Sequence, residues 1–321
     1  MKMRKKVYGF AVLVMALVLT LGPVGWVGAE ESGSAEAAAK DKGDGKLRII
    51  VFGAHPDDCE HRAGGVAAMW AAQGHHVKFV SVTNGDIGHA VMAGGQLAKR
   101  RMAEVKECAK ILGIDESQVL DIHDGELMPT LENRKTFVRL IREWKADIVM
   151  AHRPNDYHPD HRYTGILMQD AAFMVTVSFF CPDVPQLARN PVFLYLSDNF
   201  QKPNPFEPDV VVAIDDVFEK KVDALWSFQS QIESLWTTGN FEKIVPVPKD
   251  PAGREARRRQ MRNRFTRRWE AVANKYRPKL IGLYGDKKGK KVKYAEAFEL
   301  CEYGRQPSAA ELKKLFPFFK N

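Results

Sequence analysis

Two short histidine-rich segments of the sequence carry the residue types of a catalytic metal site. The first reads AHPDD at 54–58, and the second ends in HPDH at 158–161. Pro56 favours an extended conformation at His55 and suits the start of a helical turn, on which His55 and Asp58 can converge on one ion. Two neutral imidazoles and one carboxylate with an open position form a common catalytic zinc set, and the same donors also suit non-haem iron.

Each segment alone has a plainer interpretation. A single His-Pro-Asp is also typical of a capped turn, in which the Asp lies at a helix N-terminus and interacts with the helix dipole. The two segments nevertheless share residue types, and all nine histidines of the chain lie between His55 and His161. We therefore predict one metal site built from both segments. Asp57 is expected to point elsewhere, because Asp58 takes the metal-facing direction on the turn.

Strand and helix patterns alternate around these segments. Buried strands are predicted at 47–53, 76–83, 119–122 and 146–151, and helices at 63–73, 95–113, 131–144 and 159–177. Strands separated by helices imply βαβ units, and so an α/β fold with a largely parallel sheet and helices on both faces. Each predicted strand is followed by a polar cluster, and ligands bind beyond the carboxyl ends of strands in such a sheet. The active site is therefore expected at that edge.

The second half of the chain is less regular. Segments 192–196 and 210–214 are expected to add edge strands, and 217–236 to form one long helix. The segment from 251 onward is basic, and we expect it to be helical and to pack on the outside. Because no clean boundary for a second domain is visible, 47–321 is predicted to be a single domain with a basic helical C-terminal extension.

The N-terminus carries the pattern of an export signal. Four cations within the first six residues precede an apolar run, and a Gly-Pro break and small residues then lead to Ala29. Residues 1–29 are predicted to be a signal peptide and 30–46 a flexible linker. The protein is therefore expected to be periplasmic or extracellular, with no stable membrane span in the mature chain. An uncleaved anchor is the alternative, because the apolar run approaches spanning length.

Charge and cysteine content narrow the choice of partners. The formal net charge is +8, and removal of the four N-terminal cations leaves +4 (8 − 4) on the mature chain. So mild a charge does not indicate nucleic-acid binding, and export argues further against it. The four cysteines are widely and irregularly spaced, at Cys59, Cys108, Cys181 and Cys301. They are expected to be buried free thiols, although export permits a disulfide.

The motifs taken together resemble those of the N-acetylglucosaminyl-phosphatidylinositol de-N-acetylase family, PIG-L, also called LmbE-like. The likeness rests on AHPDD at 54–58, Gly64-Gly65, TNGD at 83–86, DGEL at 124–127 and NDYHPDH at 155–161, in the same order and spacing. It runs from about 47 to 164, with weaker likeness at 221–231 and 294–298.

This resemblance implies a Rossmann-like fold and a divalent metal, usually Zn²⁺, although Fe²⁺ or another divalent ion fits the donor set. It implies that the ion is bound by His55, Asp58 and His161. Asp57 would be the general base, His158 would face the developing oxyanion, and Asp160 would orient a histidine. The family usually has Glu directly after AHPDD, whereas this chain has Cys59 and then Glu60, so a supporting hydrogen bond from that position is in doubt.

The same resemblance suggests substrate contacts. Arg101, with Glu104 one turn further on, looks like the substrate-contacting arginine of the family, and Asn84 and Asp124 belong to the motifs expected to border the substrate. The plainer interpretation of Arg101 is a surface cation on a helix. Both interpretations of Arg101 remain open from the sequence.

The resulting hypothesis is zinc-dependent removal of an N-acetyl group from an amino sugar of the N-acetylglucosamine type. Alternatives are an amidase that cleaves a larger amide, or a catalytically weak glycan-binding module of the same fold. An intact Asp57 and a complete ligand set argue against the binding module, and no G-x-S-x-G is present to suggest a serine nucleophile.

Two partner questions also stay open from the sequence. The basic segment 254–268 is typical of a solvated helix face, but it could also hold an anionic glycan or a lipid headgroup. Members of the family often form homo-oligomers, and the sequence itself shows no interface.

Overall fold

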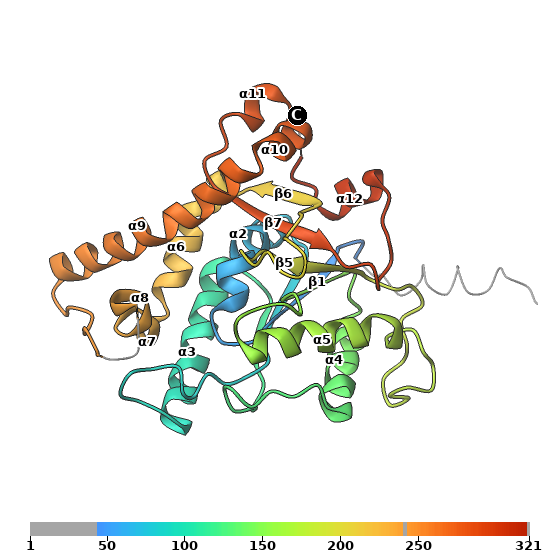
Figure 1. Ribbon diagram of the computed structural model, residues 1–321, viewed down its shortest axis with the longest axis horizontal. Coiled ribbons are helices and arrows are strands. Elements are labelled where there is room, and N and C mark those ends of the chain that lie inside the picture. Colours follow the sequence, from blue (N-terminus) through green and yellow to red (C-terminus); the bar gives the residue numbers. More distant parts are fainter. Residues whose placement is uncertain (1–43, 240–242, 320–321) are drawn as a thin grey trace, which may run out of the picture. The chain divides into compact units, whose positions relative to one another are not determined.

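The structure, a computed structural model, describes residues 44–239 and 243–319 (Figure 1). The predicted signal peptide, 1–29, lies outside the described residues, and so does most of the predicted linker, 30–46. Export and cleavage therefore stay predictions. Within the described ranges, none of the helices combines the length and the apolar character that a membrane span requires.

One sheet organises the described residues, in the strand order β3-β2-β1-β4-β5-β7-β6 (Figure 1). Its strands are β1 (Arg48–Gly53), β2 (His76–Ser81), β3 (Glu116–Val119), β4 (Ile148–Ala151), β5 (Val192–Leu196), β6 (Val210–Ala213) and β7 (Ala295–Leu300). The pairs from β3 through β5 are all parallel, whereas β7 runs antiparallel to both β5 and β6. The expected largely parallel sheet is confirmed.

Helices cover both faces of this sheet, as expected. In β1, Ile49 and Val51 belong to one cluster of buried residues, whereas Ile50 and Phe52 belong to the other, because successive strand side chains point to opposite faces. The helices on the first face are α2 (Asp58–Ala72), α3 (Gly95–Leu112), α6 (Phe218–Trp226) and α9 (Pro251–Lys275). Those on the second face are α4 (Leu131–Glu143) and α5 (Pro159–Met174).

Several elements differ from the sequence-based expectation. The prediction that β5 is an edge strand is wrong, because β7 pairs with it on the outer side. The long helix expected at 217–236 is wrong too, since the chain there forms a 3₁₀ turn (Asp215–Val217), α6, α7 (Gln229–Ile232) and α8 (Leu235–Thr238). Helix α2 begins five residues earlier than expected, which places Asp58 in its first turn.

The C-terminal segment contains more than the expected basic helix. After α9 come α10 (Arg277–Tyr284), α11 (Asp286–Gly289), strand β7 and α12 (Ala309–Leu315). Helix α9 itself is not simply external, because Met261, Phe265, Trp269 and Ala273 are buried at helical spacing along one face. The segment therefore supplies both a core helix and a strand of the main sheet.

The connections bring the two histidine-rich segments together. Strand β1 lies between β2 and β4, so the chain leaves β1 toward one side of the sheet and later continues on the other side. Such a switch point opens a crevice at the carboxyl ends of the strands, where ligands of open α/β sheets bind. The segment after β1 carries His55 to Asp58, and the segment after β4 carries His152 to His161.

Candidate metal centre

The three residues expected to bind the metal converge on one point. His55 Nδ1 lies 3.2 Å from His161 Nε2 and 3.4 Å from Asp58 Oδ2, and His161 Nε2 lies 3.4 Å from Asp58 Oδ2. Ligand atoms about 2.0–2.1 Å from a tetrahedral zinc ion are about 3.3–3.4 Å apart, so this spacing fits the ion. The donor types also fit, because two imidazoles and one carboxylate suit a catalytic zinc site.

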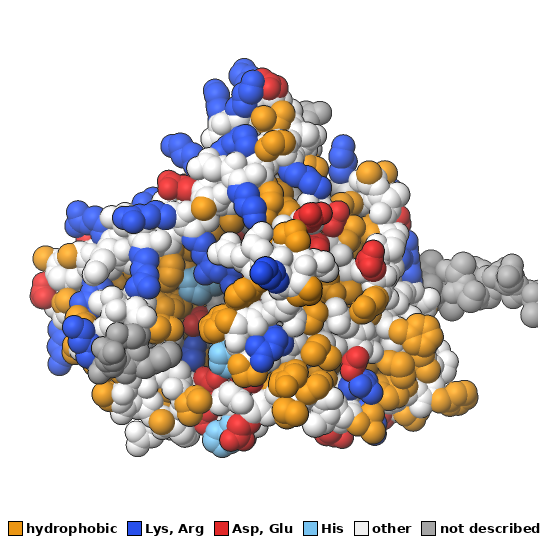
Figure 2. All heavy atoms as spheres, viewed as in Figure 1, with side chains coloured by type: hydrophobic (Ala, Val, Ile, Leu, Met, Phe, Trp, Pro, Cys, Tyr) orange, Lys and Arg blue, Asp and Glu red, His pale blue; other side chains and the backbone are white. Residues whose placement is uncertain are grey.

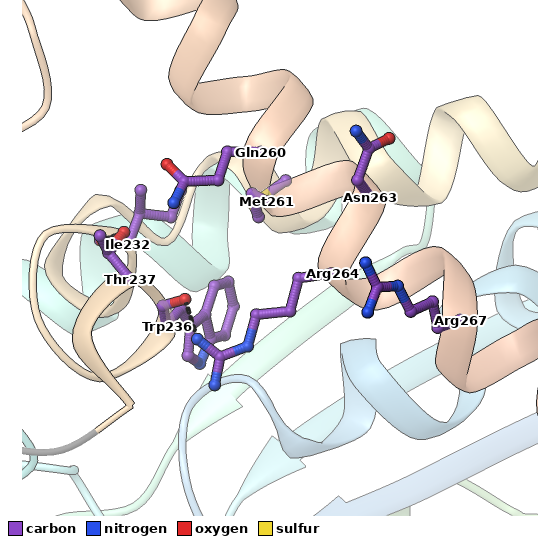
Figure 3. A pocket seen from close by; sticks show the side chains of 8 residues that line it. All are labelled: Ile232, Trp236, Thr237, Gln260, Met261, Asn263, Arg264 and Arg267. Carbon is purple, nitrogen blue, oxygen red and sulfur yellow. Dashed lines mark hydrogen bonds between the residues drawn. The ribbon is translucent and has the colours of Figure 1, made fainter.

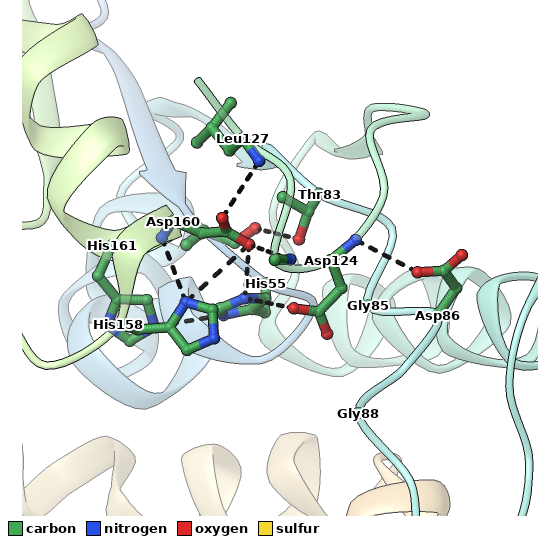
Figure 4. Close-up of polar contacts among 12 residues, drawn as sticks. His55, Thr83, Gly85, Asp86, Gly88, Asp124, Leu127, His158, Asp160 and His161 are labelled. Carbon is green, nitrogen blue, oxygen red and sulfur yellow. Dashed lines mark hydrogen bonds and ion pairs between the residues drawn. The ribbon is translucent and has the colours of Figure 1, made fainter. Parts of the chain in front are cut away.

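The outer nitrogen of His55 is fixed by carboxylates (Figure 4). His55 Nε2 lies 3.0 Å from Asp124 Oδ1 and 3.3 Å from Asp160 Oδ2. Asp160 is fully buried, and it also accepts hydrogen bonds from the backbone N–H groups of Gly125 and Leu127. A carboxylate on the outer nitrogen leaves Nδ1 as the lone-pair donor, which is the tautomer that metal binding requires.

The outer nitrogen of His161 is fixed in the same way by a residue that the sequence reasoning missed. His161 Nδ1 lies 3.0 Å from Asp156 Oδ1, so Asp156 orients His161 as Asp160 orients His55. Asp156 stands in the NDYHPDH segment, five residues before His161, and nothing in its spacing distinguishes it from a loop residue.

His152 is a second residue that the sequence reasoning did not single out. It directly follows β4, its ring stacks on His161 with the centroids 4.1 Å apart, and its Nε2 lies 3.3 Å from Asp58 Oδ2. Nε2 also accepts the backbone N–H of Ala54 at 3.2 Å. Burial and the neighbouring His161 lower the pKa of His152 to about 4, so the ring is neutral at neutral pH.

Asp58 is ionised at the centre of these histidines. Burial acts to raise its pKa, but His161 and His152 outweigh burial and hold the pKa well below the ordinary value. An ionised carboxylate between imidazoles is the charge state that a divalent cation needs. The alternative groups of nearby donors, which add His158, Asp124 or His152, share His55, Asp58 or His161 with the predicted set.

Asp57 lies beside this cluster in a strained backbone conformation. Its φ is 128°, a value that residues with a side chain rarely adopt and that occurs mostly at functional sites. Its Oδ2 lies 3.0 Å from Arg101 Nη2. Burial raises the pKa of Asp57 to about 7, against the opposing effect of Arg101.

His158 begins α5 as its N-cap. Its Nδ1 accepts the backbone N–H of Asp160 at 3.2 Å, and Pro159 follows in the first turn of the helix. In the neutral ring the proton is therefore on Nε2. Burial, with His55 and His161, lowers the pKa of His158, so the ring is neutral at neutral pH.

The residues expected to contact substrate already have partners in the protein. Arg101 is buried, so the surface interpretation is wrong; its guanidinium binds the carbonyl of Pro56 as well as Asp57. Asn84 donates to Asp121 Oδ1 and accepts from the backbone N–H of Asp86. Substrate contact by Arg101, Asn84 and Asp124 stays a prediction.

The cysteines are buried and unpaired, including Cys59. The Cys59 thiol donates toward the carbonyl of Val51, inside the core of the sheet. It therefore packs as a small buried residue under the metal centre. Glu60, which follows it, is also buried, and burial raises the pKa of its carboxyl to about 8.

Comparison with known proteins agrees with this geometry. Residues 50–172 match the model of the family PIG-L, described as GlcNAc-PI de-N-acetylase. The chain is 33% identical over 199 residues to diacetylchitobiose deacetylase of Thermococcus kodakarensis, an alignment that covers 59% of this chain and 72% of the relative. The chain belongs to the PIG-L family. PIG-L proteins are generally metal-dependent de-N-acetylases, and this chain is an enzyme of that kind.

Two further proteins are similar to this chain. The chain is 27% identical over 198 residues to 4-oxalmesaconate hydratase of Pseudomonas putida, covering 58% of this chain and 74% of that protein. Among solved structures, N,N'-diacetylchitobiose deacetylase from Pyrococcus horikoshii matches with a TM-score of 0.59 and 22% identity, over 82% of this chain and 88% of that one. The structural match supports the fold.

Proposed function

We propose that this PIG-L protein is a zinc-dependent hydrolase that removes an N-acetyl group from an amino sugar. The observation that carries the proposal is the convergence of His55 Nδ1, Asp58 Oδ2 and His161 Nε2 to within 3.2–3.4 Å of one another. The relative with 33% identity, named for its action on diacetylchitobiose, supports an acetylated amino sugar as the substrate class.

Zinc is the proposed ion because the donor set and its spacing fit a tetrahedral site. Bound there, zinc would act as a Lewis acid that polarises a carbonyl oxygen and makes water more acidic. Asp57 would accept the proton of the attacking water, since its carboxylate lies beside the cluster without being one of the three converging donors.

The reaction balances with these groups alone. Water supplies a hydroxyl group to the acetyl carbon, the carbon–nitrogen bond breaks, and acetate and a free amine leave. The proton that Asp57 accepts returns to the departing nitrogen. His158 Nε2, which carries the ring proton and has no hydrogen-bond partner among the described residues, would donate to the carbonyl oxygen as negative charge develops.

Acetate release tests the proposal. Protein prepared without chelator is incubated with N,N'-diacetylchitobiose, and acetate and free amine are measured. The same assay is repeated after chelation and after zinc is added back. We expect equal amounts of acetate and amine, loss of release on chelation, and recovery with zinc. Release that survives complete removal of metal would contradict a metal-dependent mechanism, and no release from any acetylated amino sugar would contradict the substrate class.

We also propose that the protein is exported. The support is the sequence alone, a basic start, an apolar run and small residues before Ala29. N-terminal sequencing of protein recovered from its native host should find a chain that begins near Glu30. An intact Met1 would instead support the membrane-anchor alternative.

A further inference from the structure

Helix α9 carries two different arrangements of arginine along its sides. On the side that faces α6, Arg262 Nε lies 2.9 Å from Glu219 Oε1, and Arg258 is paired with Asp223. On another side, Gln260, Asn263, Arg264 and Arg267 follow one another at i, i+3, i+4 and i+7, so they share one face of the helix. Neither Arg264 nor Arg267 has a carboxylate partner among the described residues.

A cavity lies against this second face. It has a volume of about 340 Å³, and its lining includes Arg264, Arg267, Gln260, Asn263, Thr237 and Trp236. Figure 3 shows Arg264 and Arg267 extending from α9 into the same space, which Trp236 of α8 borders from the other side. No acidic side chain is among the described residues that line it, and its volume lies in the range of small-molecule sites, ~300–1,000 Å³.

The cavity is connected to the metal centre through α2. The Trp236 ring packs edge-on against His61, with the centroids 4.7 Å apart, and His61 is one helical turn beyond Asp58. Figure 2 shows histidine side chains in a hollow of this face that Lys and Arg side chains border. The first turns of α2 therefore lie between the cavity and the metal centre.

Two more guanidiniums lie near this part of α2. Arg62, next to His61 on α2, and Arg268, next to Arg267 on α9, are close enough that Arg62 is the main cause of a lowered Arg268 pKa, about 9. The Asp58 carboxylate acts on the same group in the opposite sense. Positive charges held near one another are stabilised by an incoming anion, and arginine binds carboxylate and phosphate in a bidentate manner.

We propose that the cavity between α8 and α9 is a subsite for a carboxylate or phosphate group of a glycan whose acetamido group reacts at the metal centre. The reaction of the acetamido group at the metal centre rests on the proposed function. Binding of the anionic group in the cavity does not depend on it. The subsite resolves the two interpretations of the basic segment 254–268: one side of the helix pairs with α6, and the other side holds an anionic sugar.

Kinetics with matched substrates test the subsite. Acetate release by the full-length, zinc-loaded protein is measured with a neutral N-acetylated disaccharide, with one that carries a glucuronate carboxylate, and with one that carries a phosphate. We expect KM to be lower for the charged substrates, and the advantage to shrink as salt is added, because salt screens exposed charges. Whichever charged probe has the lower KM identifies the anionic group.

Variants on α9 test whether the lower KM of charged substrates depends on the arginines of the cavity. Arg267→Gln should remove most of the advantage of a charged substrate, with its KM rising about tenfold, and Arg264→Gln/Arg267→Gln should remove the rest. Arg259→Gln is the control, since Arg259 is an exposed cation on the same helix outside the cavity, and it should keep the advantage of the charged substrate. Equal KM values for neutral and charged substrates in the unmodified protein would overturn the subsite.

A binding measurement separates this proposal from the proposed function. Calorimetry with a glucuronate-containing disaccharide that has no acetamido group reports the subsite without any reaction. Tight binding that Arg267→Gln weakens supports the subsite even where no acetate is released from any substrate. Binding that is equal in the unmodified protein and in Arg264→Gln/Arg267→Gln refutes the subsite, whether or not acetate is released.

Discussion

Each histidine proposed to bind the metal is held by a carboxylate on its outer nitrogen. The partner of His161 is Asp156, and its removal provides a test of this arrangement. Asp156→Asn keeps the shape of the side chain but lets the amide present its N–H₂ group to Nδ1, which no longer fixes the tautomer. We expect zinc affinity to fall by about 10- to 100-fold. Titration with a competing chelator measures this, with the exposed Asp183→Asn as the control, which should bind zinc normally.

Asp57 is distinguished from the ligands by what it contacts. It pairs with Arg101 at 3.0 Å, whereas Asp58 lies among the histidines. Asp57→Asn should therefore keep its metal and its fold, while the rate of acetate release falls by about 10²–10⁴-fold through loss of the general base. Metal analysis and steady-state kinetics on the same sample test whether Asp57 is the general base or a metal ligand. A variant that has lost its metal would show that Asp57 is a ligand.

His61 predicts an acid-sensitive step in stability. It packs between Trp236 and Phe265, and burial, together with Arg268 and Lys221, holds its pKa well below the usual 6.5. As the pH falls below about 6.5, His61 is protonated in the unfolded chain but stays neutral in the folded chain. The free energy of unfolding therefore falls with pH in this range, by up to ~1.4 kcal/mol per pH unit.

Replacing the ring with one that cannot be protonated should remove this step. In His61→Phe, the midpoint of urea unfolding should fall less between pH 7 and pH 5 than in the unmodified protein. Comparing two proteins that share the metal centre cancels acid effects on the metal ligands. Parallel slopes in the two proteins would mean that His61 is protonated in the folded state.

Individual site residues could be predicted from the sequence only where their spacing formed a recognisable pattern. His55 and Asp58 are three apart after a strand, and HPDH repeats the same types, so one metal site built from both segments could be predicted. The choice of His161 as the third ligand came from the resemblance to the PIG-L family. His152 is a single histidine at a strand end, and it becomes part of the centre only because β4 lies beside β1. That proximity is a property of the sheet, so no local pattern reveals it.

At the scale of elements, the end of α5 depends on one side chain of α4. The Arg142 guanidinium is buried and donates to backbone carbonyls that follow or close α5, those of Met174, Val175, Val177, Phe180, Cys181 and Val184. The carbonyls of Met174, Val175, Val177 and Cys181 also accept backbone N–H groups, whereas those of Phe180 and Val184 have no other donor among the described residues. One arginine thus organises the whole connection from α5 toward β5.

Arg142→Met should therefore be costly. The two carbonyls that lose their only donor, those of Phe180 and Val184, each carry a penalty of about 1–3 kcal/mol, so we expect the free energy of unfolding to fall by at least ~2 kcal/mol. The control is Arg139→Met, one turn earlier on α4, where the arginine pairs with Asp183 at the surface. Urea unfolding should show little change in the control. Equal losses in both variants would mean that the carbonyls find water instead.

The break between α6 and α7 shows why element boundaries were harder to predict. The apolar periodicity of 217–236 indicates one helix, but the chain turns at Phe228, where ψ is 61°. The turn lets Ser230 present its backbone N–H and its hydroxyl to the carboxylate of Glu104, at 2.8 and 2.6 Å. Glu104 lies on α3, so the reason for the break is far away in the sequence.

At the scale of the whole molecule, one buried ion pair joins three distant segments. Glu296 of β7 accepts the backbone N–H groups of Gly65 and Val66 at 2.8 Å, and it pairs with Lys221 of α6, which also donates to the carbonyl of His61. A side chain at Gly65 would meet Glu296 and Ile214 at 2.8–2.9 Å, so glycine is required there. The helix that carries Asp58 is thereby fixed to the C-terminal strand.

Removing one partner of this pair should destabilise the fold more than removing both. Burial lowers the pKa of Lys221 to about 8, against the attraction of Glu296, so the charge is held in place by its partner. Glu296→Leu alone should lower the free energy of unfolding by about 3–5 kcal/mol. The double variant Glu296→Leu/Lys221→Met should lose clearly less than the sum of the losses in Glu296→Leu and in Lys221→Met. Urea unfolding of the four proteins measures the coupling, and additive losses would contradict it.

The overall architecture could be predicted only in part. The first four strands and their helices alternate strongly enough to indicate a parallel sheet, and the structure confirms this arrangement. The third strand lies at Glu116–Val119, however, so its prediction at 119–122 was about three residues too late. Strand β7 escaped detection because its sequence, AEAFEL, places Glu296 at a buried position, where only Lys221 makes a carboxylate acceptable. Without β7, β5 could only be expected at an edge.

The position of β7 also has a consequence for how the chain is made. Strand β7 leaves the ribosome after β5 and β6, yet it is inserted between them in the sheet. Until then the nascent chain exposes one open edge of β5 and an unpaired β6, and open edges pair readily with other chains. The sheet can therefore be completed only after residues 295–300 have been synthesised, so the open edge of β5 must be kept from pairing with other chains until then.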